Sequence, residues 1–205
     1  IYTIAYTLSL HDALRSEELA IDILGPIMSN GTKYYVIVLL DLFSRWPEVK
    51  ITTNIDSDKI IKFLDGCFSR EGLPASILSD NGVQFTLRET KEYLNNLGIC
   101  QKFTSLYHPQ TNGVVERFNK VLKESIKIAK SQGLNWKEVL LHRVEIYRFT
   151  PHSTTGKTPF ELSRGRRPNT ELFPSWIERH KWDREKDKSV SLGSGKHKGL
   201  NIPLP

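Results

Sequence analysis

The first part of the chain carries three runs of apolar and β-branched residues that predict strands. These runs lie at about 19–24, 33–42 and 45–52. Asn30-Gly31 between the first two runs is a common hairpin turn, and Phe43-Ser44 fits a tight reversal before the third. We therefore expect an antiparallel meander at the start of the domain.

Helical periodicity follows this meander. Asp56 can cap a helix that runs to about Phe68 and is ended by Gly72 and Pro74. The apolar residues on the inner side of this helix would be Ile60, Ile61, Phe63 and Leu64. A strand at 75–79, a helix at 86–97 ended by Gly98, and a strand at 99–103 come next. Strands that alternate with helices predict a mixed α/β sheet.

The next segment changes character twice. Residues 105–112 contain Pro109 and several polar residues, and they predict a flexible loop. From Gly113 to about Lys130, apolar residues recur at helical spacing. The same spacing places four charged residues in one stripe, namely Glu116, Lys120, Lys123 and Lys127. In isolation such a stripe indicates a solvated helix face.

Three acidic residues occupy positions that favour shared chemistry. Asp22 interrupts an otherwise apolar strand, Asp80 closes another, and Glu116 follows Asp80 after 35 intervening residues at the start of the predicted helix. An acid in a buried strand is costly unless something pairs with it. Any one of them alone is more simply a turn or cap residue, since Asp-Asn-Gly at a strand end is ordinary turn chemistry.

Brought together, these carboxylates would repel one another by about 4 kcal/mol per pair at 4 Å with an effective dielectric near 20. A divalent cation relieves that repulsion. Mg²⁺ is usually held by a few protein oxygens together with water and phosphate, and paired ions suit phosphoryl transfer. The three acids therefore predict a metal-dependent site for phosphoryl transfer.

The charge distribution adds a candidate partner. The chain has a formal charge of +6, yet residues 111–205 contain 19 Lys and Arg against 10 Asp and Glu, while residues 19–110 contain 9 against 10. A surface that serves only solubility would mix both signs, so the asymmetry favours a polyanion. No apolar run approaches the ~20 residues that span a membrane.

The two cysteines do not indicate zinc. Cys67 and Cys100 are isolated, and neither belongs to a Cys-x-x-Cys or His-x-x-x-His pair. We expect two buried thiols in a reducing compartment.

Six segments of the chain, in the same order, resemble the catalytic core of retroviral and LTR-retrotransposon integrases, most closely the gypsy-like elements. The segments are Ile21-Asp22-Ile23-Leu24-Gly25-Pro26, Asp41-Leu42-Phe43-Ser44-Arg45-Trp46-Pro47, Ser79-Asp80-Asn81-Gly82-Val83-Gln84-Phe85, Tyr107-His108-Pro109-Gln110-Thr111-Asn112-Gly113, the stretch around Glu116, and Pro151-His152-Ser153-Thr154-Thr155-Gly156-Lys157-Thr158-Pro159-Phe160-Glu161-Leu162. Together they cover roughly residues 19–175.

The resemblance implies an RNase H-like fold, with a mixed five-stranded sheet flanked by helices. It implies that Asp22, Asp80 and Glu116 are catalytic and bind two Mg²⁺ or Mn²⁺ ions. The implied enzyme is a polynucleotidyl transferase. It directs water at a phosphodiester near each end of the element DNA, and the freed 3′-hydroxyl then attacks target DNA.

Further site residues are implied in the same way. Lys120 and Lys123 match lysines that integrases place against DNA, and Asn119 matches a residue that supports the metal site. Tyr107 and Asn112 fall where the loop approaches the DNA end, although retroviral enzymes often have Gln in place of Asn112. The implied partners are element-end DNA, target DNA and further copies of the chain, at least as a dimer. The implied site of action is the nucleus, after a cytoplasmic virus-like particle stage.

Both ends of the chain differ from the central domain. Residues 1–18 resemble translated sequencing adapters, and we expect them to be non-native. Residues 176–205 are rich in charge, Gly and Ser, which predicts a basic, loosely structured tail. Integrases usually carry a His/Cys zinc module upstream of the core, so we expect a chain truncated at both ends, which could be inactive by itself.

Other interpretations stay open at the level of sequence. One is a non-catalytic relic or a host-adopted DNA-binding protein, and another is a different RNase H-like nuclease or transposase. His108 and His152 could act as bases but fit loop roles better, because each lies beside a proline. All four tryptophans could stack on bases, namely Trp46, Trp136, Trp176 and Trp182. Trp46 and Trp136 fit the core or a subunit contact better.

Overall fold

The computed structural model describes residues 18–103 and 109–168, without the side chains of residues 109–112. The predictions for residues 1–17, Tyr107, His108 and the 176–205 tail therefore lie outside the described residues. No helix in the described part of the chain is both long and apolar enough to cross a membrane.

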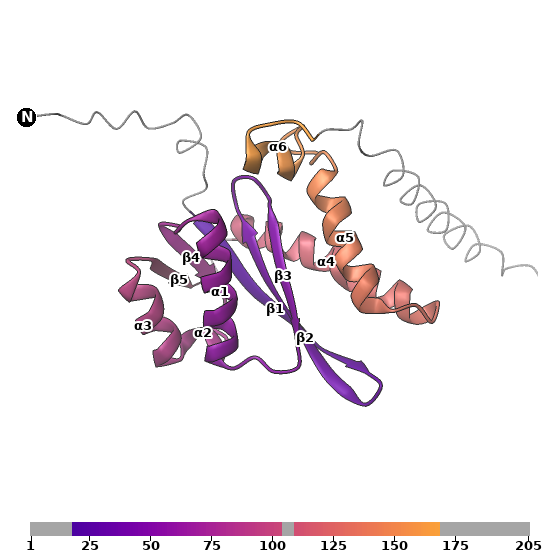
Figure 1. Ribbon diagram of the computed structural model, residues 1–205, viewed down its shortest axis with the longest axis horizontal. Coiled ribbons are helices and arrows are strands. Elements are labelled where there is room, and N and C mark those ends of the chain that lie inside the picture. The colour runs from indigo at the N-terminus through magenta and orange to yellow at the C-terminus, as the bar shows by residue number, and fades with distance from the viewer. Residues whose placement is uncertain (1–17, 104–108, 169–205) are drawn as a thin grey trace, which may run out of the picture. The chain divides into compact units, whose positions relative to one another are not determined.

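A five-stranded mixed sheet forms the centre of the domain, as predicted, with the strand order β3-β2-β1-β4-β5 (Figure 1). Strands β1 (Glu18–Ser29), β2 (Thr32–Asp41) and β3 (Pro47–Thr52) are the expected antiparallel meander. Strands β4 (Ser76–Ser79) and β5 (Cys100–Phe103) run parallel to β1.

Strand β1 continues past the predicted end at residue 24. Its pairing with β2 shifts register between Leu24 and Ile27, which accommodates Pro26, a residue without a backbone donor. A Cβ on Gly25 would lie 2.7 Å from Tyr35, so only glycine fits this close approach. The hairpin then closes at Asn30-Gly31, where both residues have positive φ, as the predicted turn requires.

Helices cover both faces of the sheet (Figure 1). Successive side chains of β2 point to opposite faces, and the buried ones pack against helices on either side. On one face α1 (Ser57–Glu71), α2 (Val83–Thr86) and α3 (Arg88–Asn96) pack on Ile37 and Leu39. On the other face α4 (Pro109–Ser131) and α5 (Trp136–Phe149) pack on Val36, Val38 and Leu40. The short α6 (Pro159–Arg164) follows α5.

Local capping fixes two of these helices. Asp56 caps α1 by accepting a hydrogen bond from the Lys59 backbone, and Gly72 ends the helix, as the sequence predicts. Thr158 and Glu161 form a capping box at the start of α6. Trp136 is buried in the core, which confirms one of its two predicted roles.

The helix predicted at 86–97 is confirmed to within two residues by α3, but the short α2 before it is not predicted from the sequence. Leu87 is extended and separates α2 from α3. Phe85 and Leu94 are both buried in the same core cluster, and the Thr90 hydroxyl donates to the Gln84 carbonyl across the break. The break allows both side chains to reach the core from short helices, and hydrophobic periodicity alone does not reveal it.

Helix α4 begins at Pro109, inside the segment predicted as a loop. Proline is favoured in the first turn of a helix, where its missing N–H has no partner to lose, so Pro109 starts the helix and does not break it. Glu116 therefore lies in the second turn of α4 and not at its start.

The reversal between β2 and β3 is longer than the predicted Phe43-Ser44 turn. The Asp41 carboxylate accepts hydrogen bonds from the Phe43 and Ser44 backbones, and the Asp41 N–H donates to the Trp46 carbonyl. Arg45 adopts φ 65, and β3 starts at Pro47. An aspartate that binds its own turn in this way stabilises the wider loop.

The prediction of two buried thiols is wrong for one of them. Cys67 on α1 is buried, whereas Cys100 is exposed. Cys100 begins β5, where exposed and half-buried residues alternate, and it lies with Lys102 on the exposed face of that strand.

Candidate active site

The three predicted acids come together around one pocket. Asp22 lies within β1, Asp80 directly follows β4, and Glu116 lies on α4. Because β1 and β4 are parallel with Ala20 opposite Leu78, Asp22 and Asp80 project from equivalent positions, two residues further along. All three acids line a pocket of about 230 Å³.

Asp22 is the most constrained of the three. Its Oδ1 accepts a hydrogen bond from the Ile23 backbone at 2.7 Å, and its Oδ2 accepts one from the Asn119 side chain at 2.5 Å. Burial raises the pKa of Asp22, and repulsion from Asp80 raises it further, although the hydrogen bonds and the Lys123 charge oppose both effects. A positive charge in the pocket would therefore be favourable.

Asp80 is held by its own turn. Its Oδ1 accepts a hydrogen bond from the Gly82 backbone at 2.9 Å. A Cβ on Gly82 would lie 2.8 Å from that same oxygen, so the glycine makes room for the carboxylate. The Asp-Asn-Gly sequence thus forms a turn and also orients the Asp80 carboxylate.

Asn119 contacts the pocket through one of its acids, Asp22. The side chain is only 4% exposed, and it joins α4 to β1 by donating to Asp22. Its Oδ1 and the Ser79 Oγ are buried without a hydrogen-bond partner in the described part of the chain. In this structure Asn119 supports an acid of the pocket.

The donor chemistry of the pocket fits a hard divalent cation, since carboxylate, amide and hydroxyl oxygens are the ligands that Mg²⁺ and Mn²⁺ prefer. The orphaned oxygens of Ser79 and Asn119 add to this fit. However, within residues 18–103 and 109–168 no three His, Cys, Asp or Glu side chains are arranged to hold one ion. The pocket therefore has suitable ligands but not a formed metal cluster.

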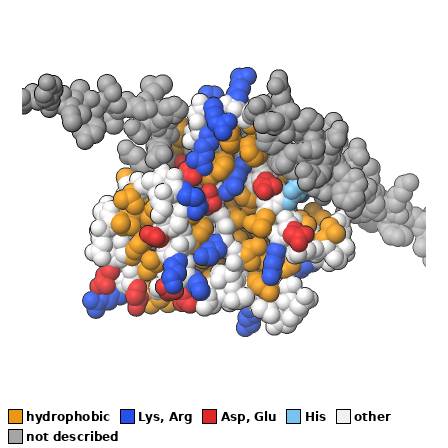
Figure 2. Space-filling view, viewed as in Figure 1, with side chains coloured by type: hydrophobic (Ala, Val, Ile, Leu, Met, Phe, Trp, Pro, Cys, Tyr) orange, Lys and Arg blue, Asp and Glu red, His pale blue; other side chains and the backbone are white. Residues whose placement is uncertain are grey.

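The predicted DNA-contact residues are only partly placed. Lys120 and Lys123 are exposed on α4, and Lys123 is close enough for its charge to lower the pKa of Asp22. Asn112 lies in the first turn of α4, with its side chain not described. In the view of Figure 2, Lys and Arg side chains gather near the top and are elsewhere interspersed with acidic ones.

His152 does not line the acid pocket. Its ring packs edge-on against Tyr147, with 6.2 Å between the ring centroids, and its backbone closes the loop before α6. This position agrees with the loop role that the sequence favoured for His152.

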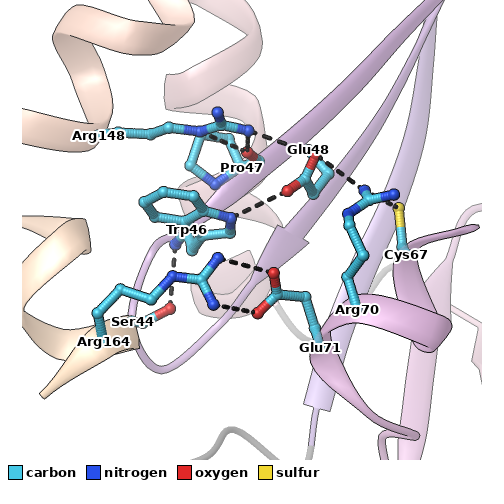
Figure 3. Close-up of polar contacts among 9 residues, drawn as sticks. All are labelled: Ser44, Trp46, Pro47, Glu48, Cys67, Arg70, Glu71, Arg148 and Arg164. Carbon is cyan, nitrogen blue, oxygen red and sulfur yellow. Dashed lines mark hydrogen bonds and ion pairs between the residues drawn. The ribbon is translucent and has the colours of Figure 1, made fainter.

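Sequence reasoning missed a polar network around Trp46 (Figure 3). The Trp46 ring lies between the guanidinium groups of Arg148 and Arg164, 4.4 and 4.9 Å from its centroid. Its indole N–H donates to Glu48, and Arg164 forms a two-point ion pair with Glu71. Figure 3 shows how these contacts join α5, α6 and α1 to the start of β3. The partners are far apart in sequence, so no local pattern reveals them.

Comparison with known proteins agrees with this arrangement. The family model described as "Integrase core domain" matches residues 17–109. Residues 17–109 therefore match the integrase core family. The matched segment includes Asp22 and Asp80, and Glu116 follows it on α4.

Relatives extend the similarity beyond that segment. The chain is 37% identical over 153 residues to an uncharacterized protein of Caenorhabditis elegans, covering 74% of this chain and 12% of that protein. It is 34% identical over 161 residues to the Gag-Pol polyprotein of avian reticuloendotheliosis virus, covering 78% of this chain and 14% of the polyprotein. The chain thus spans about an eighth of the length of these relatives.

Solved structures share the fold of the integrase core. A chain of the simian T-cell lymphotropic virus intasome in complex with PP2A regulatory subunit B56 gamma matches with a TM-score of 0.65 and 23% identity, covering 75% of this chain and 56% of that one. The HTLV-2 integrase catalytic core domain in complex with magnesium matches with a TM-score of 0.60 and 21% identity, covering 73% and 97%. The RNase H-like architecture predicted from sequence is therefore confirmed.

Proposed function

We propose that this chain is the catalytic core of a gypsy-like retrotransposon integrase, a polynucleotidyl transferase that processes the 3′ ends of element DNA and joins them to target DNA. The observation that supports this most is the convergence of Asp22, Asp80 and Glu116 on one pocket in a chain that matches the integrase core family.

The residues of the chain have distinct roles in this proposal. Asp22, Asp80 and Glu116 would hold two Mg²⁺ or Mn²⁺ ions, which when bound activate the attacking oxygen and stabilise the leaving one. Asn119 and the Gly82 backbone hold the two aspartates in place. Both steps are in-line displacements at phosphorus, so catalysis depends mainly on positioning and charge.

Lys120 and Lys123 would bind the phosphate backbone of DNA beside the acids. Both are exposed on the helix that carries Glu116, one and two turns further along it. Tyr107 and Asn112 would approach the DNA end from the start of this helix. Element-end DNA and target DNA are the partners, and joining two ends together requires at least a dimer. We place the reaction in the nucleus, after a cytoplasmic particle stage.

A strand-transfer assay tests the proposal. The substrates would be duplexes with the element's terminal repeats and a supercoiled target, with Mg²⁺, Mn²⁺ or EDTA, using this chain and a longer protein in which flanking sequence is added to it. We expect metal-dependent joining that Asp80→Asn abolishes and Ser153→Ala, a change at an exposed loop residue, preserves. Joining that persists in EDTA or in Asp80→Asn would contradict the assigned chemistry, and DNA binding without joining by the longer protein would favour a non-catalytic relic.

A further inference from the structure

Two arginines outside the acid pocket lie close enough for the charge of one to act on the other. Arg45 lies in the turn between β2 and β3, and Arg117 lies on α4, directly after Glu116. Burial lowers the pKa of His152, and both arginine charges lower it further, so both lie within electrostatic reach of that ring. Tyr147 packs against His152 and is close to the same two charges.

These arginines differ from the others that pack near the sheet. Arg148 and Arg164 pair with Glu48 and Glu71, whereas Arg45 and Arg117 form no ion pair within the described residues. The Nε of Arg45 is buried without a hydrogen-bond partner there. Asp41 acts on Arg45, but its Oδ1 already accepts hydrogen bonds from the backbone of the turn.

An unpaired buried donor and two adjacent cations have a cost that an anion would remove. Burial is the main cause that lowers the pKa of Arg45, and the Arg117 charge adds to it. The backbone at Arg45 has φ 65, a conformation that non-glycine residues adopt infrequently. Arg45 thus carries a buried donor that no described residue satisfies.

We propose that Arg45 and Arg117 bind one phosphodiester group of the DNA backbone, with the Tyr147 hydroxyl as an additional donor. Guanidinium groups match phosphate because two parallel N–H groups can bind two of its oxygens. Burial raises the pKa of Tyr147, so its hydroxyl keeps the proton that it would donate. The inference rests on the proposed function, because it extends the DNA path from Glu116 across Arg117 to the β2–β3 turn.

DNA binding in EDTA across a salt series tests this inference without requiring catalysis. We expect Arg117→Gln to weaken binding of duplex DNA about tenfold, as loss of a charged hydrogen bond does. The slope of log K against log salt should become shallower by about 0.9, which corresponds to one phosphate. Arg45→Gln should change the affinity and the slope by similar amounts. The double variant should bind DNA only slightly more weakly than either single variant, because both arginines bind the same phosphate. Arg45→Lys, which keeps the charge but loses the fork, should weaken binding less.

Arg88→Gln is the matched control, because Arg88 is an exposed arginine on α3 that pairs with Glu92. It should leave the slope unchanged. Thermal melts would show whether Arg45→Gln still folds, and if it does not, the exposed Arg117 provides the decisive variant. An unchanged slope in Arg117→Gln would overturn the inference, provided that the parent chain binds DNA. A parent chain that fails to bind DNA would instead count against the proposed function.

A second measurement distinguishes DNA from free phosphate. The NMR signal of His152 should shift when duplex DNA is added to the parent chain, and should shift much less in Arg117→Gln. Inorganic phosphate should cause the same shift only at far higher concentration. A shift with inorganic phosphate but none with DNA would overturn the assignment to a nucleic-acid backbone.

Discussion

The side-chain amide of Asn119 donates a hydrogen bond to Asp22 across a sequence separation of 97 residues. This single contact fixes the orientation of a pocket carboxylate and connects α4 to the central strand β1. Because Asp22 also accepts from the Ile23 backbone, both of its oxygens are held before any ligand binds.

Asn119→Ala should therefore reduce strand transfer far more than DNA binding. The change leaves a half-buried carboxylate without one of its donors, which should lower the free energy of unfolding by about 1–3 kcal/mol. Urea denaturation and a strand-transfer assay would measure the two effects. Asn96→Ala, at an exposed position of α3, is the control and should change neither. Full activity in Asn119→Ala would contradict a positioning role.

Asp80→Asn should keep the fold while removing the response to metal. The asparagine can still accept the Gly82 hydrogen bond, and it removes a charge that repels Asp22. Without metal we expect the melting temperature to stay level or rise slightly, and Mg²⁺ should stabilise only the parent chain, by mass action. Thermal melts with and without Mg²⁺ would decide. A strongly destabilised variant in EDTA would show that Asp80 is a structural residue.

Two glycine substitutions should have opposite effects. An alanine Cβ at Gly82 would collide with Asp80 Oδ1, whereas one at Gly113 meets no atom within 4 Å. Gly82→Ala should weaken metal binding and strand transfer, while Gly113→Ala should stabilise α4 by about 0.4–1 kcal/mol. Calorimetry of Mn²⁺ binding and thermal melts would test the pair. Unaltered Mn²⁺ affinity in Gly82→Ala would mean that the Asp80 carboxylate does not need this space.

The two thiols should differ in reactivity. Burial raises the pKa of Cys67 to about 11, so about one Cys67 thiol in a thousand is ionised at pH 8. Cys100 is exposed at the edge of the sheet. Iodoacetamide at pH 8 should modify Cys100 alone in the native chain and both cysteines in urea, as read by peptide mass spectrometry. Rapid native modification of Cys67 would indicate that α1 opens readily.

Lys120 and Lys123 should each bind a DNA phosphate. Replacing either with Ala should make the slope of log K against log salt shallower by about 0.9 and weaken binding to many sequences alike. Both side chains are exposed, so stability should change by no more than about 0.5 kcal/mol. Lys59→Ala on α1, which packs on the opposite sheet face from α4, is the control. An unchanged slope in the double variant would leave these lysines as a solvated helix face.

Local physics made much of the fold predictable. The alternation of apolar residues gave the meander, and the side chain of Asp56 marked the start of α1 because a cap acts within four residues of itself. The three acids could be predicted as a set because the pattern of apolar residues also predicts the strands and the helix on which they lie. Their convergence on one pocket agrees with that expectation.

Features that depend on distant partners could not be predicted. The short α2 before Leu87 buries Phe85 in the same cluster as Leu94, and the exposure of Cys100 follows from the face of β5 on which it lies. The loop predicted around Pro109 is wrong because proline has two opposite effects on helices. It breaks a helix in the interior but is favoured in the first turn, where Pro109 lies. The unpaired state of Arg45 likewise depends on which charges fold next to it.

The packing of α4 and α5 on one face of the sheet also affects how copies of such a gene decay. A premature stop codon placed after β5 would remove Glu116, but it would also expose the row formed by Ala20, Val36, Val38 and Leu40. The shortened product would keep all five strands without the cover for one side of them. Such a polypeptide should aggregate or be degraded, so a nonsense mutation directly after β5 would eliminate the folded domain and not merely remove Glu116.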